Sequence, residues 1–185
     1  MAATTAAPHP RIAELLNELQ HSRHDLLAAV AAVPPEVREA ASNGADWSVA
    51  QILEHLSMVE DGAGRLVSTL MKQAQAAGAF ETDDSSVLGS MDHFAVKDLS
   101  KRIQAPERVL PTGGVTAAQG LERLAAVRER LVTALLQGSG LALGTVSFPH
   151  PLFGPLNGYQ WVLTIALHER RHVSQLRRQF GAMVA

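Results

Sequence analysis

The sequence contains 185 residues, of which 46% are hydrophobic and 18% charged, and its formal net charge is −2. This length and composition suit one globular domain with a sizeable core and exclude an intrinsically disordered chain. The small negative charge excludes a general electrostatic attraction to nucleic acid or to an anionic membrane. The absence of cysteine excludes disulfides and thiolate chemistry by the protein's own side chains.

Residues 1–9 are expected to form a flexible tail, and residues 10–185 a single domain. The tail lacks the cationic stretch followed by apolar residues that marks a signal peptide. No apolar run in the chain is long enough to cross a bilayer. We therefore expect a cytoplasmic protein.

The first helix is predicted to begin at Pro10, where proline suits the first turn, and to end before Pro34-Pro35. Between these points leucine, isoleucine and valine recur at helical spacing. His21 and His24 lie in the polar middle of this stretch and are expected to face solvent, as is His9 in the tail.

The second helix is predicted to begin with a capping box of Ser48 and Gln51 and to extend to about Ala77. His55 stands on the apolar stripe of this helix, which faces the core. A lone histidine on such a stripe is more often a hydrogen-bonded core residue than a metal ligand. Both interpretations of His55 stay open on the pattern alone.

Two stretches, residues 78–115 and 140–156, contain several glycines and prolines and show no sustained periodicity. We predict long connections here, with room for a short helix within 92–102, and expect them to form the mouth of any site on the bundle. They contain His93 and His150, and a lone loop histidine is usually neither ligand nor catalyst. Between them, Thr116 and Gln119 form the capping box of a third helix.

The last helix is predicted over Asn157–Gly181, with Asn157 and Gln160 as a capping box. It carries His168 and His172, which are four residues apart and therefore project from one face. This spacing commonly presents two imidazoles to one divalent metal ion. The elements together predict an all-α fold: an antiparallel four-helix bundle with long crossover connections.

The segment from His168 to His172 also matches the H-E-x-x-H motif of zinc peptidases, with Glu169 as the general base. Such peptidases usually take a third ligand from farther along the chain. The residues after His172 contain no histidine, aspartate or glutamate, and Gln175 stands where the longer form of the motif needs glycine. We therefore interpret the match as a coincidence.

Three parts of the chain resemble the DinB-like (YfiT-like) superfamily of metal-dependent hydrolases. The resemblance rests on Trp47-Ser48 with Leu53 and His55-Leu56, on Ile103-Gln104-Ala105-Pro106-Glu107 continuing to Pro111-Thr112-Gly113, and on His150-Pro151-Leu152-Phe153-Gly154-Pro155-Leu156 leading to Trp161, His168, His172 and Gln175. It implies a four-helix bundle with an unusual connection order. It also implies a divalent metal ion held by His55, His168 and His172.

Three imidazoles with one open position are typical of a catalytic rather than a structural metal site, and zinc or nickel would suit nitrogen ligands. Because ligation needs neutral imidazole, metal affinity is expected to fall below about pH 6.5. The resemblance implies an enzyme related to transferases that use bacillithiol or mycothiol, or to a mycothiol-dependent isomerase. A metal-dependent hydrolase and a non-catalytic, stress-associated metal-binding bundle are the alternatives.

The expected partner is a small-molecule substrate, in particular a low-molecular-weight thiol, and a homodimer is left open. The arginines of the last helix complement the helix dipole and are not interleaved with aromatic residues, so nucleic acid is not expected; neither is a membrane. Glu54 and Glu60 lie near His55 in sequence but point in other directions by helical rotation. No general base beside the metal is therefore apparent, and the catalytic residues stay unassigned.

Overall fold

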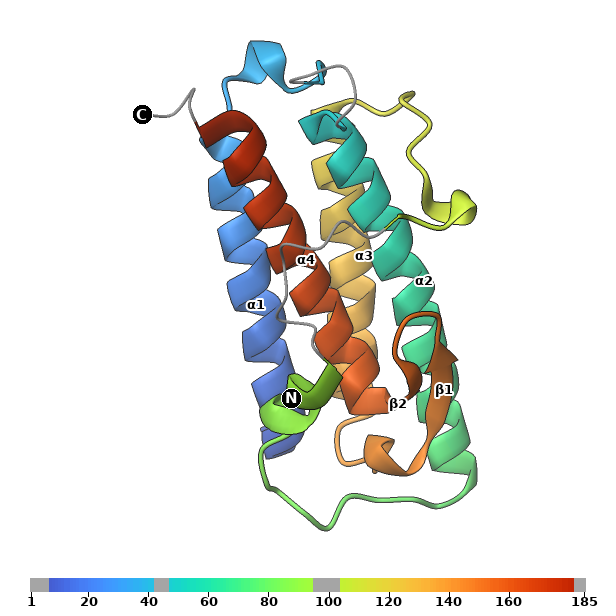
Figure 1. The fold of residues 1–185 in the computed structure, drawn as a ribbon. Helices are drawn as coiled ribbons and strands as arrows, with labels where there is room; N and C mark the ends of the chain where they lie inside the picture. The colour runs from blue at the N-terminus through green and yellow to red at the C-terminus, as the bar shows by residue number, and fades with distance from the viewer. Residues whose placement is uncertain (1–6, 42–46, 95–103, 182–185) are drawn as a thin grey trace, which may run out of the picture.

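The computed structural model describes residues 7–41, 47–94 and 104–181 of the chain. In this part of the chain four long helices form a bundle: α1 (Pro10–Ala31), α2 (Val49–Ala76), α3 (Ala117–Gln137) and α4 (Gly158–Phe180) (Figure 1). The all-α fold class is confirmed. All three predicted capping boxes are present, at the first turns of α2, α3 and α4.

The path of the chain differs from the expected antiparallel order. Helices α1 and α4 run in one direction, and α2 and α3 run in the other (Figure 1). The densest packing joins α2 to α3 and α1 to α4, while α4 also packs against α2. Neighbours α2 and α3 can be parallel because the long connection between them returns the chain to the end of the bundle where α2 began.

Shorter elements occupy the connections. Four 3₁₀ helices are present among the described residues: η1 (Pro35–Val37), η2 (Leu88–Phe94), η3 (Glu107–Val109) and η4 (Leu143–Thr145). Residues 95–103, which include most of the short helix predicted within 92–102, lie outside the described part.

A β-hairpin precedes α4 in a segment that we predicted to be irregular. Strands β1 (Ser147–His150) and β2 (Gly154–Asn157) pair antiparallel, with Phe148 opposite Leu156. The prediction missed them because the strands are only four residues long and each contains a proline, which hides the alternating pattern of a strand.

The start of α1 also differs from the expected loose tail. His9 is the N-cap of α1. Its ring Nδ1 accepts a hydrogen bond from the backbone N–H of Arg11, and its backbone N–H donates to Ser139 Oγ at 2.7 Å. His21 and His24 are exposed on α1, as predicted.

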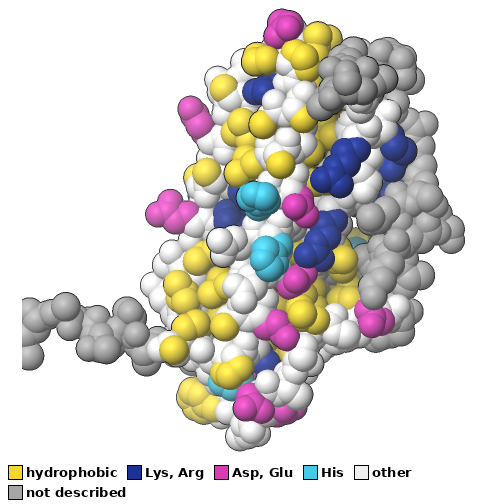
Figure 2. All heavy atoms as spheres, turned by 90° about the vertical axis from the view of Figure 1, so that its left-hand side faces the viewer, with side chains coloured by type: hydrophobic (Ala, Val, Ile, Leu, Met, Phe, Trp, Pro, Cys, Tyr) yellow, Lys and Arg dark blue, Asp and Glu magenta, His cyan; other side chains and the backbone are white. Residues whose placement is uncertain are grey.

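The face of the molecule in Figure 2 mixes acidic, basic, histidine and hydrophobic side chains. Within the described residues no helix combines the length and apolarity needed to cross a bilayer.

The hydrophobic core has two clusters, one towards each end of the bundle. A layer of charged side chains lies between them, with buried glutamates and partly buried arginines, and each helix contributes one residue: Arg23, Glu60, Arg128 and Glu169. Arg23 binds Glu60 and Glu169 at 2.7 Å each, and Arg128 binds them at 2.5 and 3.0 Å. Two positive and two negative charges balance, so the layer can be buried without an unpaired ion.

Candidate metal centre

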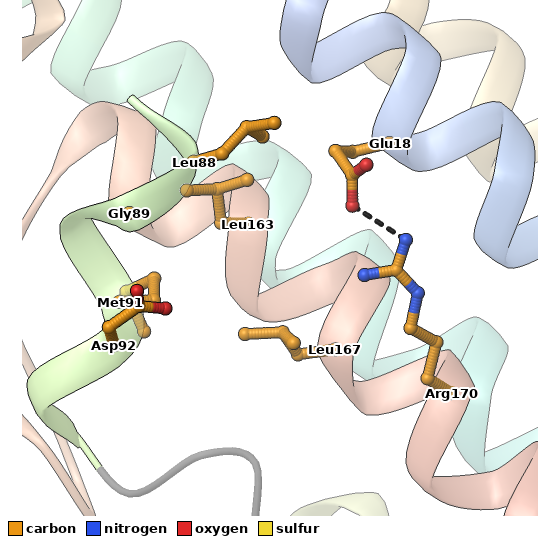
Figure 3. A pocket seen from close by; sticks show the side chains of 8 residues that line it. All are labelled: Glu18, Leu88, Gly89, Met91, Asp92, Leu163, Leu167 and Arg170. Atoms are coloured by element: carbon orange, nitrogen blue, oxygen red, sulfur yellow. Dashed lines mark hydrogen bonds and ion pairs between the residues drawn. The ribbon is translucent and has the colours of Figure 1, made fainter. Parts of the chain in front are cut away.

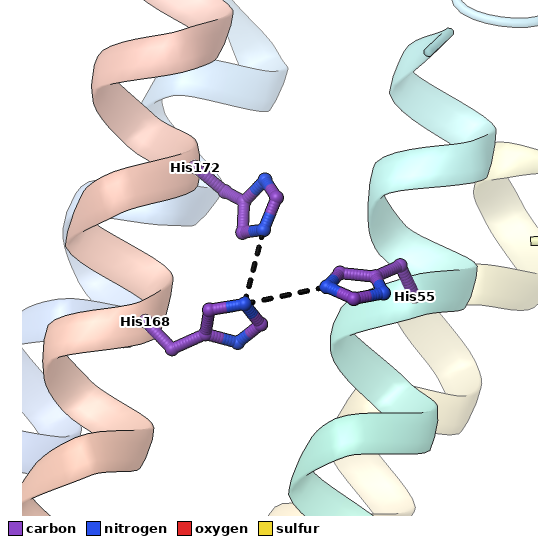
Figure 4. Close-up of side chains that lie close together, drawn as sticks. All are labelled: His55, His168 and His172. Atoms are coloured by element: carbon purple, nitrogen blue, oxygen red, sulfur yellow. Dashed lines mark hydrogen bonds between the residues drawn. The ribbon is translucent and has the colours of Figure 1, made fainter. Parts of the chain in front are cut away.

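The structure brings the three predicted ligands together between α2 and α4 (Figure 4). His168 and His172 project from one face of α4 toward His55 on α2. The Nε2 atom of His168 lies 3.3 Å from that of His55 and 3.2 Å from that of His172. One ligand atom from each residue lies within 4.8 Å of the others, so the group could hold a metal ion.

Hydrogen bonds on the far side of two rings determine which nitrogen faces the centre. His55 Nδ1 lies 2.7 Å from the carbonyl oxygen of Val109, which can only accept, so Nδ1 carries the proton. His172 Nδ1 lies 2.8 Å from Gln175 Oε1 and donates in the same way. The Nε2 atoms of His55 and His172 therefore point lone pairs into the centre, as metal ligands do.

Burial keeps the three imidazoles neutral. Burial is the largest influence on the pKa of His55 and lowers it, while the hydrogen bond to Val109 has a smaller effect that raises it. Burial and the neighbouring His55 lower the pKa of His172 to about 3. For His168, burial and then the two other histidines hold the pKa well below its ordinary value. Neutral imidazole is the form that binds a metal ion.

The nitrogens fit a divalent ion better than they fit one another. In the neutral state at most one ring proton, that of His168, can lie among the three Nε2 atoms, yet His168 Nε2 contacts both others. A proton on His168 Nε2 leaves one donor for two acceptors, and a proton on its Nδ1 leaves lone pairs facing each other in both contacts; a cation at the centre would relieve either arrangement. Two nitrogens each about 2.0–2.1 Å from one tetrahedral zinc ion are about 3.3 Å apart, which matches the observed 3.2 and 3.3 Å.

Aromatic side chains pack around the histidines. The ring centroid of Trp47 lies 4.8 Å from that of His55 and 6.3 Å from that of His172, and the latter pair is stacked. At the end of β1, His150 stacks on Phe153 with centroids 4.6 Å apart. The ring centroid of His150 also lies 4.9 Å from that of Trp161, which places the hairpin against α4, the helix that carries His168 and His172.

The described residues of the two long connections lie in different places, and the mouth of the centre stays a prediction. Val109 contacts His55 and the hairpin packs against α4, whereas the η2 residues Leu88, Gly89, Met91 and Asp92 line a cavity elsewhere. That cavity, of about 280 Å³, lies between α1, η2 and α4, and Glu18 and Arg170 form an ion pair at its edge (Figure 3). His93 lies in η2, and its side chain is outside the described part of the structure.

The carboxylates near the histidines in sequence have other partners. Glu169, the base of the peptidase motif, is 1% exposed and binds Arg23, Arg128 and the hydroxyl of Ser22. Glu60 belongs to the same charged layer. This placement agrees with the interpretation of the H-E-x-x-H match as a coincidence.

Comparison with known sequences identifies the family. The sequence profile of the DinB superfamily matches residues 7–176. The chain belongs to the DinB superfamily. The uncharacterized protein YuaE of Bacillus subtilis strain 168 is 26% identical over 133 residues, which cover 71% of this chain and 76% of YuaE.

A solved structure is similar to this DinB-superfamily chain in fold. The crystal structure of TT2238, a four-helix bundle protein, superposes with a TM-score of 0.61 at 23% identity. The match covers 90% of this chain and 98% of TT2238. At this identity the likeness supports the bundle fold alone.

Sequence reasoning missed two contacts that orient the candidate ligands His55 and His172 in this DinB-superfamily protein. Gln175 could have been found as the partner of His172, because residues three apart in a helix are neighbours. Val109 could not, because its backbone carbonyl carries no sequence signal and lies 54 residues from His55.

Proposed function

We propose that this protein is a metal-dependent enzyme that transfers a group to or from the sulfur of a low-molecular-weight thiol. His55, His168 and His172 hold the divalent ion, with zinc or nickel the expected metal. The observation that carries the proposal is the convergence of three neutral imidazole nitrogens, two of them oriented by Val109 and Gln175.

Three protein ligands leave a coordination position for a substrate atom. A divalent ion in such a site lowers the pKa of a thiol and so favours the nucleophilic thiolate at neutral pH. The protein supplies no sulfur of its own, because the chain has no cysteine. The histidines, held neutral by burial, supply the ligand lone pairs, and Trp47 covers two of them.

The placement of the acidic residues supports thiol chemistry over hydrolysis. Hydrolysis commonly uses a carboxylate base beside the metal-activated water. Here Glu60 and Glu169 are engaged by arginines, and Glu54 accepts hydrogen bonds from Thr112 and Gly113. A thiol with a lowered pKa needs no such base.

One observation favours a metal-dependent hydrolase as the second candidate. His150 lies on the hairpin that packs against α4, and burial lowers its pKa, which favours the neutral ring that can accept a proton. Its Nδ1 already accepts the N–H of Leu152, which leaves Nε2 as the N–H of the neutral ring. His150 would therefore have to release the Leu152 hydrogen bond, or exchange tautomers, before acting as a base.

Parallel assays separate these functions. Zinc-loaded and nickel-loaded protein is incubated with bacillithiol, mycothiol, cysteine or coenzyme A together with a halogenated bimane or an epoxide, and separately with ester and amide substrates without thiol. Thiol-dependent turnover that disappears in His168→Ala supports the transferase. Turnover of esters or amides alone assigns a hydrolase. Metal binding without turnover of any pair overturns the enzyme proposal and leaves a non-catalytic metal-binding bundle.

A further inference from the structure

We infer that Glu54 is a positioning residue of the metal centre, which acts on His55 through the turn of residues 109–113. This inference rests on the proposed metal centre and goes beyond it. The carboxylate accepts hydrogen bonds from the backbone N–H of Thr112 at 3.0 Å, from the Thr112 hydroxyl at 2.7 Å, and from the N–H of Gly113 at 3.2 Å. His55, the next residue in α2, contacts the same turn at Val109.

The carboxylate of Glu54 is buried, with 3% of the residue exposed. Among the described residues its partners are these three donors, and none of them is a cation. A buried carboxylate is costly unless several donors satisfy it. Since its oxygens are occupied in this way, Glu54 is an anchor for the turn and not a proton acceptor for a substrate.

Within the described part of the chain, the turn has few other attachments near the centre. Residues 106–108 and Leu110 are exposed, and η3 is a single 3₁₀ turn with no side-chain cap. Gly113 adopts a φ of 77°, a backbone conformation that residues with a side chain rarely adopt. This conformation directs the N–H of Gly113 toward Glu54. With little apolar surface to hold the turn, its three hydrogen bonds to Glu54 determine where the Val109 carbonyl stands.

The position of that carbonyl determines the tautomer of His55. When Val109 accepts from Nδ1, the ring lone pair lies on Nε2, 3.3 Å from His168 Nε2. If the turn moves away, the ring of His55 loses the Val109 acceptor at Nδ1 and can place its proton on Nε2, the nitrogen that faces the other histidines. Glu54 thus affects metal binding without touching the metal ligands.

Substitution by glutamine provides a conservative variant. The amide oxygen of Glu54→Gln can accept the N–H groups of Thr112 and Gly113, and the amide N–H can donate to the Thr112 hydroxyl, which can reverse its role. Glu54→Ala removes all three hydrogen bonds. Ser57→Ala is the matched control, since Ser57 is a buried α2 residue two positions from His55 whose hydroxyl donates to the backbone carbonyl of Glu54.

Two readouts test the inference. The first is the zinc affinity of wild type and variants, measured by competition with a chromophoric chelator. We expect a loss of about tenfold or more in Glu54→Ala, the size that loss of an outer hydrogen-bond partner commonly causes, and changes below threefold in Glu54→Gln and Ser57→Ala. Should Glu54→Ala fail to fold, Thr112→Val, which removes the exposed hydroxyl that donates to Glu54, should also lower the zinc affinity, by more than either control variant.

The second readout is the tautomer of His55 in metal-free protein, from the ¹⁵N chemical shifts of its ring. Wild type, Glu54→Gln and Ser57→Ala should show the proton on Nδ1, and Glu54→Ala a mixture that includes Nε2–H. A folded Glu54→Ala with the wild-type tautomer and wild-type zinc affinity overturns the inference. If wild-type protein binds no metal, the proposed function fails, but the tautomer measurement still decides the role of Glu54.

Discussion

His168 and Glu169 are neighbours in the chain, but their side chains face different parts of the molecule. His168 contacts His55 and His172, whereas Glu169 is buried in the charged layer with Arg23 and Arg128. Successive residues of a helix are rotated by about 100°, which accounts for this separation. The H-E-x-x-H motif therefore contains His168, a residue of the candidate metal centre, next to Glu169, whose ion pairs connect the helices.

Glu169→Gln should weaken folding and leave metal binding unchanged. The substitution removes one charge from a buried network and leaves the arginines incompletely paired, which costs on the order of 3 kcal/mol. Glu60→Gln is the matched control, because Glu60 binds the same two arginines from α2. Urea unfolding should show similar losses in the two variants, with metal content per folded chain equal to wild type. A loss of catalysis confined to Glu169→Gln, with metal retained, would revive the peptidase interpretation.

Two glycines should respond oppositely to alanine. At Gly62 in α2 a Cβ atom would meet nothing within 4 Å, so Gly62→Ala should stabilise the protein by about 1 kcal/mol through helix propensity. At Gly120 in α3 a Cβ atom would lie 2.7 Å from Leu53 Cβ on α2. Since neither helix backbone can move freely, Gly120→Ala should destabilise by about 1–3 kcal/mol. Urea midpoints that shift in the same direction for both variants would contradict this account of α2–α3 packing.

Local signals made much of the fold predictable. The capping boxes of Ser48, Thr116 and Asn157 depend only on residues three positions away, and all three form. The apolar periodicity of four stretches likewise predicted the four helices. Apolar periodicity could not predict which helices would be parallel. The direction of α3 depends on the path of the connection before it and not on the pattern within the helix.

The candidate site was predictable where spacing or resemblance pointed to it. His168 and His172 follow from helical spacing alone, and His55 was added by its place on a core stripe together with the family resemblance. The structure brings the three together, and their binding of metal stays a prediction. The partners of Glu169 were not predictable, because Arg23 lies 146 residues away and periodicity does not specify such pairs.

The metal-free protein should lose stability as the pH falls below 6.5. Burial lowers the pKa values of His55, His168 and His172 in the folded state, so the unfolded chain binds more protons than the folded one in acid. Unfolding therefore becomes easier as the pH falls, by up to about 1.4 kcal/mol per pH unit for each fully shifted histidine. Denaturant titrations at several pH values between 6 and 5 give the free energy of unfolding as a function of pH. This free energy should fall less steeply with decreasing pH in His172→Gln than in wild type. Equal slopes would contradict the burial of a neutral His172.

Metal affinity should persist to lower pH than the ordinary pKa of histidine suggests. The sequence alone predicts a fall below about pH 6.5, but the lowered pKa values mean that protons compete for the nitrogens only in more acidic solution. Chelator competition should therefore show a zinc affinity that begins to decline only below pH 6.5, after correction for the chelator's own protonation. A decline that begins at pH 6.5 would show that the imidazoles are not held neutral by burial.

The most direct measurement of the central claim is the metal content of the purified protein after exposure to zinc or nickel and removal of free ions. We predict about one ion per chain in wild type, a sharp loss in His55→Ala, His168→Ala and His172→Ala, and none in the triple variant. The control is the double variant His21→Ala and His24→Ala, which removes two exposed histidines three residues apart on α1 and should retain full occupancy. Equal metal content in wild type and the folded triple variant would contradict a three-histidine centre.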